Sequence, residues 1–354
     1  MKYGQLPALL DKERLDDSLL LGFYGGGNYG DELLMETLAG LLKQRGASNI
    51  SIAYQTPESY HDFHHDFGYP RVAMRSKLQL FKAIAAKKNI VIGGGGLWGM
   101  DANLNILLMS FMLFAARFLL GKKIYLLGVG YYHSAPIIGR ISAWLAAKAA
   151  TAIIARDEET YQNFKRLQPH TTRDVDMAWY IHALDLNAYT ADLTKLQKRL
   201  PVHQKTLFIT LRRFRGSTGD RLAALVEECI AKNSDKPIIV ALMEPRGVDP
   251  EGYHLLQSWQ QRYSNVRTID FCFNPLALFL FFRAYHTKLT YIGPQFHGIL
   301  SAHLTGVPYL PLAYDNKVQG LLKHIAPQRP PIAVQSLRLL DVQTFIDGVY
   351  GVST

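Results

Sequence analysis

The chain has 354 residues, which is long for one compact core and sufficient for two domains. Apolar residues make up 48% and charged residues 19% of it, a balance that excludes a largely disordered protein. Lys and Arg outnumber Asp and Glu by 39 to 29, for a formal net charge of +10. Because this excess is scattered rather than gathered in basic runs, we expect small anions or a membrane surface as partners, and no nucleic acid.

Cysteine usage and the N-terminus both favour the cytoplasm. The two cysteines, Cys229 and Cys272, are too few for a disulfide framework, and we expect both to be buried, reduced thiols. Residues 1–18 mix acidic and basic side chains and lack the apolar core of a signal peptide. We therefore expect a cytoplasmic protein.

Apolar, strand-like runs alternate with helical patterns along most of the chain, which is typical of parallel α/β layers. In the first half the pattern predicts helices over Asp31–Gln44 and Ile138–Ala149, and strands over Leu19–Tyr24, Ile50–Tyr54, Asn89–Ile92, Ile124–Leu127 and Ala152–Ala155. After a break at Leu200–Pro201 the alternation begins again. The strands predicted there are Thr206–Leu211, Pro237–Leu242, Val266–Ile269, Leu289–Ile292 and Pro308–Leu310, and helices are predicted around Leu222–Ile230 and from Pro275, Phe296 and Lys317.

This alternation predicts an α/β fold of two Rossmann-like domains that face a central cleft, the arrangement called GT-B. We place the N-terminal domain at residues 1–190 and the C-terminal domain at residues 191–354. Open parallel sheets bind ligands beyond the carboxyl ends of their strands. The motifs described next follow predicted strands, so we expect them at those ends.

A first glycine-rich turn, Phe-Tyr-Gly-Gly-Gly-Asn-Tyr-Gly-Asp-Glu over residues 23–32, joins the first strand to the first helix. Glycine lets the backbone approach a ligand, and the helix N-terminus offers N–H groups to an anion. We predict that Gly26, Gly27 and Asn28 contact the substrate and that Asp31 caps the helix. A tight turn with a capping aspartate is the alternative. The spacing matches no nucleotide-binding fingerprint.

Two more glycine-rich turns follow buried strands. In the run Gly93–Gly96 we predict substrate contacts at Gly94 and Gly95. Trp98, just beyond it, suits either stacking on a sugar ring or the core, and the sequence leaves both open. The third turn is Gly128-Val129-Gly130. Three such turns at successive strand ends indicate a binding site, whereas one alone would not.

The second half places basic residues at a strand end. Arg212, followed by Arg213 and Arg215, ends the strand Thr206–Leu211. Guanidinium groups pair bidentately with phosphate or carboxylate, so we predict an anion contact at Arg212. A solvated basic loop is the alternative.

A histidine lies in the first turn of the helix predicted from Phe296. Gln295, Phe296 and His297 follow the strand Leu289–Ile292, and a helix N-terminus disfavours the protonated imidazole while placing it near a bound anion. We predict substrate contacts at Gln295 and Phe296, and also at Lys317, which opens a later helix. A lone histidine is otherwise most often a structural residue.

Each of two further segments has a structural and a functional interpretation. His61, His64 and His65 lie among aspartates, but their spacing matches no common metal site, so we expect a polar loop and no metal. The segment Ile106–Leu120 is a strongly apolar helix followed by Lys122 and Lys123. It is shorter than the ~20 residues of a spanning helix, and we favour a buried packing helix over a surface patch that docks on the inner face of a membrane.

With these residues in view, the chain resembles the polysaccharide pyruvyl transferase family over nearly its full length. The resemblance rests on the following segments: Gly27–Glu32, Gly93–Gly96, Ala155-Arg156-Asp157, Asp176 with Ala178, Leu211-Arg212, and the block from His297 through Gly306-Val307-Pro308 to Tyr314-Asp315-Asn316-Lys317. The last block is the most specific. Gln295-Phe296-His297 stands where the family usually has Arg-Leu-His.

The resemblance implies a GT-B-like enzyme that moves pyruvate from phosphoenolpyruvate onto a sugar as a ketal, with no cofactor. It implies that Arg212 holds the donor and that His297 is the general acid, and we predict Asp31 or Glu32 as the base. The C-terminal domain would bind the donor. The N-terminal domain would bind a glycan or lipid-linked glycan acceptor. The alternative is a GT-B glycosyltransferase that uses a nucleotide-sugar, and a protein that binds without catalysis is a third hypothesis.

Overall fold

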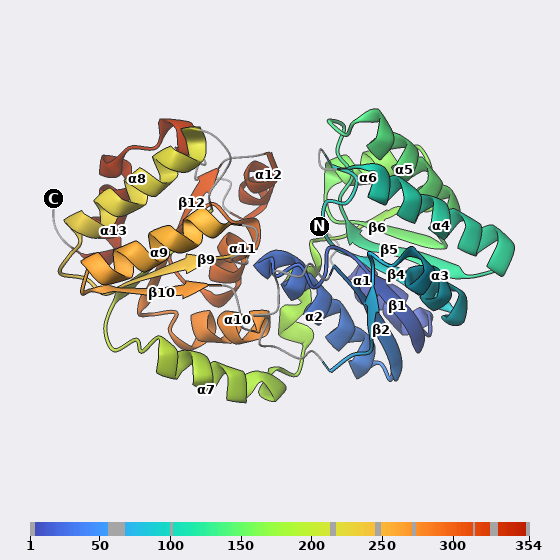
Figure 1. Cartoon of the computed structure of the whole chain (residues 1–354), viewed down its shortest axis with the longest axis horizontal. Coiled ribbons are helices and arrows are strands. Elements are labelled where there is room, and N and C mark those ends of the chain that lie inside the picture. The colour runs from blue at the N-terminus through green and yellow to red at the C-terminus, as the bar shows by residue number, and fades with distance from the viewer. Residues whose placement is uncertain are drawn as a thin grey trace. The chain divides into compact units, whose positions relative to one another are not determined.

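The structure is a computed structural model that describes residues 4–55, 68–99, 102–212, 217–244, 249–270, 274–313, 316–325 and 332–351. It divides into two compact units. Of the described residues, the first unit holds those up to Gly26 and those from Asp31 to Asp185. The second holds the short turn Gly27–Gly30 and the chain from Leu186 onward. Each unit contains one parallel sheet flanked by helices (Figure 1).

The first unit is built on a seven-stranded parallel sheet with the order β3-β2-β1-β4-β5-β6-β7. Its strands are β1 (Asp17–Leu21), β2 (Asn49–Tyr54), β3 (Arg71–Ala73), β4 (Asn89–Gly93), β5 (Lys123–Val129), β6 (Ala152–Ala155) and β7 (Thr172–Arg173). Its helices are α1 (Gln5–Lys12), α2 (Tyr29–Gln44), α3 (Lys77–Ala86), α4 (Leu104–Leu120), α5 (Ile137–Ala149), α6 (Glu158–Lys165) and the 3₁₀ helix η2 (Met177–Ala183).

The second unit repeats this plan with a six-stranded sheet in the order β10-β9-β8-β11-β12-β13. Its strands are β8 (Thr206–Leu211), β9 (Ile238–Leu242), β10 (Val266–Asp270), β11 (Leu289–Gly293), β12 (Tyr309–Ala313) and β13 (Ile332–Ala333). Its helices are η3 (Leu186–Tyr189), α7 (Thr190–Arg199), α8 (Ser217–Lys232), α9 (Pro250–Arg262), α10 (Pro275–Ala284), α11 (Phe296–Thr305), α12 (Asn316–Ile325), η4 (Val334–Ser336) and α13 (Leu339–Tyr350).

The two sheets share one topology, in which successive strands are added first to one side and then to the other. The change of side falls between β1 and β4 in the first sheet and between β8 and β11 in the second. Both pairs are parallel, with Leu21 opposite Ile92 and Ile292 opposite Ile209. Such switch points leave a crevice at the carboxyl ends of the strands. The prediction of two Rossmann-like α/β domains is confirmed.

Central strands are buried along their whole length, which explains why their sequences are continuous apolar runs. Trp98 belongs to the core of the first unit: it is fully buried and meets the ring of Phe164 edge-on at 5.5 Å. Of its two interpretations, the core is therefore correct. Cys229 is a buried free thiol, as expected, and burial raises its pKa to about 12. Cys272 lies outside the described residues.

Helix α4 is half buried rather than enclosed. Ile106, Met109, Leu113 and Ala116 face the core, whereas its other side is exposed. The expectation of a buried packing helix is thus correct for its inner face and wrong for its outer face. Among the residues that the structure describes, no helix has the length and apolar character needed to cross a membrane.

Buried charges follow β6 at the carboxyl edge of the first sheet. The Arg156 side chain is only 7% exposed, and its Nη1 lies 3.2 Å from Oδ2 of Asp176. The Nε of Arg156 lies 3.6 Å from Oδ2 of Asp157, and its Nη2 donates a hydrogen bond to the Tyr132 hydroxyl. Both aspartates accept backbone N–H groups as well, at the starts of α6 and η2. These carboxylates therefore hold one arginine and two helix ends in place.

Replacing Arg156 by Met should leave the Asp176 carboxylate buried without its cation. We expect the free energy of unfolding, measured by urea denaturation, to fall by about 3–5 kcal/mol. The matched control is Arg45→Met in the same unit, which breaks the more exposed pair with Asp11 and should cost about 0–1 kcal/mol. Equal losses in the two variants would contradict the central role of the Arg156 cluster.

Candidate active site

The switch point of the second unit brings together residues that the sequence had separated. Arg212 directly follows β8, and Gln295 directly precedes α11, which follows β11. The Gln295 side chain donates from Nε2 to the carbonyl oxygen of Leu211 at 2.9 Å, which ties the two strand ends together. Gln295 is 8% exposed, and its Oε1 has no hydrogen-bond partner among the described residues. A buried amide oxygen of this kind is a candidate acceptor for a ligand donor.

His297 lies in the first turn of α11, beside the same crevice. Its ring packs edge-on against that of Phe296, with 4.9 Å between the centroids. It also packs against Gly30: a Cβ added at Gly30 would lie 2.1 Å from Nδ1 of His297. Only glycine leaves room for the imidazole in this position.

The turn Gly27–Gly30 belongs to the second unit by its contacts. Tyr29 is buried, donates its N–H to the Met243 carbonyl at 3.1 Å, and shares a 2.8 Å hydrogen bond with Ser301 through its hydroxyl. Asn28 accepts the N–H of Gly30 at 2.9 Å. The residue that caps α2 is therefore Asn28, and the prediction of Asp31 in that role is wrong, because the helix begins two residues earlier than expected.

Glu244 joins two of the predicted binding residues and was missed from the sequence. Its Oε1 lies 3.1 Å from Nε of Arg212 and accepts from Nδ2 of Asn28 at 3.4 Å. Glu244 comes two residues after the end of β9, so its place at a strand end was the available signal. The carboxylate fixes the direction of the Arg212 guanidinium, whose side chain remains 34% exposed.

In the first unit, the turns after β1 and β4 occupy the corresponding switch point. Gly94 and Gly95 both have positive φ, +69° and +78°, which favours glycine. Tyr24 donates its hydroxyl to the carbonyl of Gly93, and burial together with the nearby charges of Asp31 and Glu32 raises the pKa of this phenol.

The two carboxylates that follow the first turn differ in exposure. Asp31 is partly exposed, and its Oδ1 would lie 3.7 Å from a Cβ added at Gly95. Glu32 is fully buried. Gly26 is partly exposed and Gly27 is buried.

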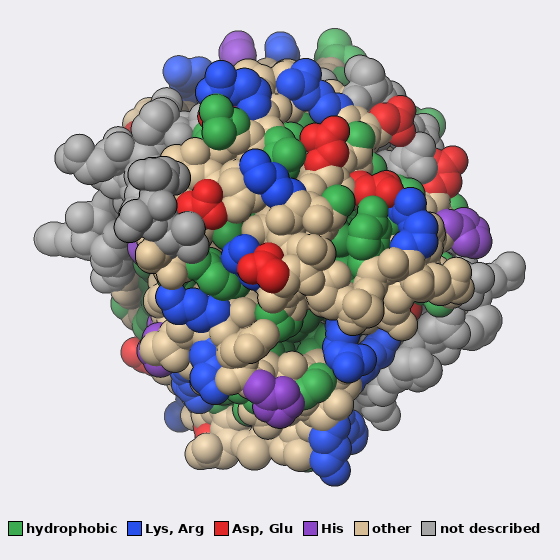
Figure 2. Space-filling model, turned by 90° about the vertical axis from the view of Figure 1, so that its left-hand side faces the viewer, with side chains coloured by type: hydrophobic (Ala, Val, Ile, Leu, Met, Phe, Trp, Pro, Cys, Tyr) green, Lys and Arg blue, Asp and Glu red, His purple; other side chains and the backbone are tan. Residues whose placement is uncertain are grey.

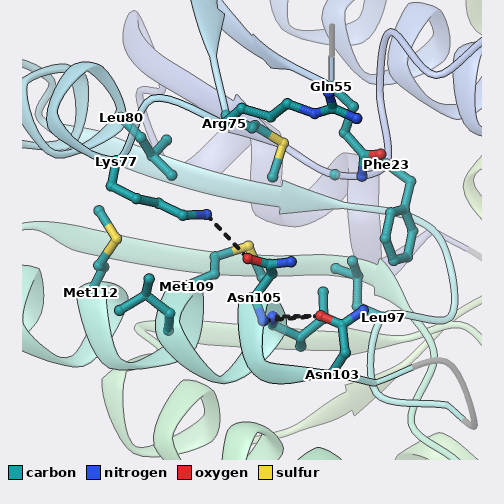
Figure 3. A pocket seen from close by; sticks show the side chains of 14 residues that line it. Phe23, Gln55, Arg75, Lys77, Leu80, Leu97, Asn103, Asn105, Met109 and Met112 are labelled. Carbon is teal, nitrogen blue, oxygen red and sulfur yellow. Dashed lines mark hydrogen bonds between the residues drawn. The ribbon is translucent and has the colours of Figure 1, made fainter. Parts of the chain in front are cut away.

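A pocket of about 260 Å³ lies in the first unit, beyond the ends of β1, β2 and β3 and between α3 and α4 (Figure 3). Its walls include Phe23 and Met109, and Arg75 and Lys77 supply positive charge. Lys77 points across it toward Asn105, with 3.4 Å between Nζ and Oδ1. The sequence did not indicate this pocket, because its residues come from separate elements with no shared motif.

Several predicted residues lie outside the part of the chain described here. These are Arg213, Arg215 and the histidines His61, His64 and His65, while of Lys317 only the helical backbone is described. Among the described residues no group of His, Cys, Asp or Glu could hold a metal ion.

Comparison with known proteins adds a family and a fold. A family model described as polysaccharide pyruvyl transferase matches residues 28–316. No curated protein matches the chain.

Solved structures with a similar fold include the UDP-GlcNAc 2-epimerase of Methanocaldococcus jannaschii, with a TM-score of 0.59, 12% identity and coverage of 93% of this chain and 91% of that chain. HepE of Anabaena, solved with UDP and glucose, gives a TM-score of 0.56 at 14% identity, with coverage of 94% and 90%. MnaA of S. aureus, solved with UDP, gives a TM-score of 0.58 at 13% identity, with coverage of 94% of this chain and 88% of that chain. These likenesses confirm the GT-B-like fold that the sequence predicts.

The Gly30–His297 contact can be tested directly. Alanine suits the backbone of Gly30, which is helical, so Gly30→Ala should keep α2 intact. The added methyl must displace the imidazole, and we expect the His297 ring resonances to shift in a ¹H–¹³C NMR spectrum. Gly320→Ala in α12, where a Cβ meets open space, is the matched control and should leave these resonances unchanged. Unshifted His297 signals in Gly30→Ala would show that the turn and the ring do not touch.

Proposed function

Since this transferase belongs to the polysaccharide pyruvyl transferase family, we propose that it moves a pyruvyl group from phosphoenolpyruvate onto a sugar of a cell-surface polysaccharide or its lipid-linked precursor. The observation that carries the proposal is the cluster at the switch point of the second unit, where Arg212, Gln295 and His297 lie around the ends of β8 and β11. We further propose that the enzyme works in the cytoplasm and uses phosphoenolpyruvate as donor without a cofactor.

The donor is proposed to bind to the second unit. Phosphoenolpyruvate carries a phosphate and a carboxylate, and the site offers the Arg212 guanidinium and the N-terminus of α11. The Gln295 amide occupies the position where the family usually carries arginine. The Gln295 amide is neutral and its Nε2 is engaged by the Leu211 carbonyl, so the positive charge for the donor is proposed to come from Arg212.

His297 is proposed as the general acid. It donates a proton to the methylene carbon of phosphoenolpyruvate, which leaves a cationic centre at the adjacent carbon. A sugar hydroxyl attacks this centre and gives its proton to a base. The C–O bond to phosphate then breaks with its electron pair, and a second hydroxyl closes the ketal while releasing its own proton. Positive charge at Arg212 stabilises the departing phosphate.

The acceptor is proposed to bind to the first unit, beside the turns that contain Gly26, Gly94 and Gly95. Of the two carboxylates proposed as base, Asp31 is favoured because it is partly exposed, whereas Glu32 is fully buried. The pocket between α3 and α4 gives this unit a cationic rim of Arg75 and Lys77, which suits a phosphate-bearing acceptor.

His297→Ala should lower kcat for pyruvyl transfer by roughly 10²–10⁴-fold, because a positioned general acid contributes about that much. The melting temperature should change little, and the exposed His286 of the same unit provides a control, since His286→Ala should keep full activity. Near-normal turnover in His297→Ala would remove His297 from the acid role.

Donor choice can be tested by the shift in melting temperature with phosphoenolpyruvate or with a panel of nucleotide-sugars. A ligand that binds only the folded protein raises the melting temperature; at 100 times Kd the stabilisation is about 2.7 kcal/mol. We expect phosphoenolpyruvate to stabilise the protein, Arg212→Ala to abolish this effect, and the exposed Arg283→Ala to preserve it. Stabilisation by a nucleotide-sugar alone would instead indicate a glycosyltransferase.

A further inference from the structure

Exposed apolar side chains are concentrated on three helices of the first unit. Among the described residues, twelve large apolar side chains are exposed, and eleven of them lie on α3, α4 and α5. The most exposed of these eleven are Leu119 at 80%, Ile137, Leu104, Leu78 and Phe118. We call the outer surface of α3, α4 and α5 the apolar face. Scattered exposed apolar residues are ordinary, but a contiguous group of this size marks an interaction site.

The three helices form one continuous surface. Helix α4 packs along α5 and also contacts α3. The rings of Phe114 on α4 and Trp144 on α5 stack with 6.5 Å between their centroids, which joins the two helices on the outer side. Phe118 extends this aromatic group, at 4.5 Å from Phe114. Of the exposed residues of α4 only Asn105 is polar, so its outer side is far more apolar than that of an ordinary surface helix.

The charge of this face has one sign. The sequences of α3, α4 and α5 contain no Asp or Glu, whereas they contain the following cations: Lys77, Lys82, Arg117, Arg140 and Lys148. Lys122 follows α4 directly after Gly121 and adds to them. The side of the molecule shown in Figure 2 is different, because both positive and negative side chains occur there and apolar ones form small separate groups.

We propose that the apolar face docks on the surface of a lipid bilayer that contains anionic lipids. Apolar side chains would enter the boundary between headgroups and acyl chains, and the surrounding Lys and Arg would meet the anionic headgroups. A second copy of this chain is a poorer occupant, because a two-fold contact would bring one cationic face against another.

The pocket between α3 and α4 lies next to the apolar face and is the proposed place for the phosphate of the acceptor. Leu108, Met112 and Lys77, which line the pocket, come from the helices of the apolar face. An enzyme docked by α3 and α4 would therefore hold its pocket close to the headgroup region, where the phosphate of a lipid-linked acceptor lies. This last step rests on the proposed function, whereas bilayer binding does not.

Cosedimentation of the full chain with vesicles tests the proposal. We expect binding to vesicles that contain phosphatidylglycerol and at least tenfold weaker binding to phosphatidylcholine alone. The double variant Phe118→Ser, Leu119→Ser should weaken binding at least tenfold, because two large apolar side chains would no longer enter the bilayer. Leu340→Ser on α13, an exposed leucine on the second unit, is the matched control and should bind normally. Both variants change exposed residues and should keep the melting temperature of the parent.

Trp144 provides a built-in probe of the docked orientation. It is 45% exposed on the apolar face, whereas Trp98 and Trp259 are fully buried and the partly exposed Trp179 lies in η2, outside the three helices. Lipids brominated on their acyl chains should quench the fluorescence of the parent protein, and Trp144→Phe should lose most of this quenching.

Three outcomes would overturn the proposal. They are absence of binding to anionic vesicles, binding that the Phe118 and Leu119 changes leave intact, and a dimer in analytical ultracentrifugation that the same changes dissociate while vesicles remain unbound. Vesicle binding without stabilisation by phosphoenolpyruvate would keep the docking surface and reject the proposed donor.

Discussion

The direction of the strands is the constraint on which the structure depends. All paired strands run parallel, so each connection must cross a face of its sheet before the next strand can begin. When the chain changes the side on which strands are added, the loops after the two central strands diverge and leave a crevice. In one unit the glycine turns after β1 and β4 occupy that place, and in the other Arg212 and Gln295 do. Chemistry is confined to these ends because the strands themselves are buried.

The central elements could be predicted because burial on both faces leaves a strong pattern. Ala152–Ala155 and Thr206–Leu211 are strands with the predicted bounds, whereas the strand predicted over Leu19–Tyr24 begins two residues earlier, at Asp17, and ends at Leu21, where the chain turns. The edge strands β3, β7 and β13 were missed. They have two or three residues, none of them fully buried, so neither alternation nor an apolar run can form.

The sequence predicted which residues belong to the candidate site, but it did not predict which of them are in contact. The sequence singles out Arg212 and His297 because each follows a buried strand. It does not reveal that Glu244 orients Arg212, since ion pairs between distant segments carry no local signature. Trp98 shows the opposite limit: an aromatic residue beside a glycine run suits a sugar and a core equally well, and only packing against Phe164 decides.

The close approach of Gly30 to His297 has an evolutionary consequence. The two positions lie at opposite ends of the chain, yet the space available at one is set by the ring at the other. A lineage that retains the imidazole has to retain the glycine, whereas a lineage that loses the imidazole is released from this restriction. Substitution of the glycine at residue 30 would therefore be an early sign, in the sequences of descendants, that the imidazole at residue 297 is no longer needed.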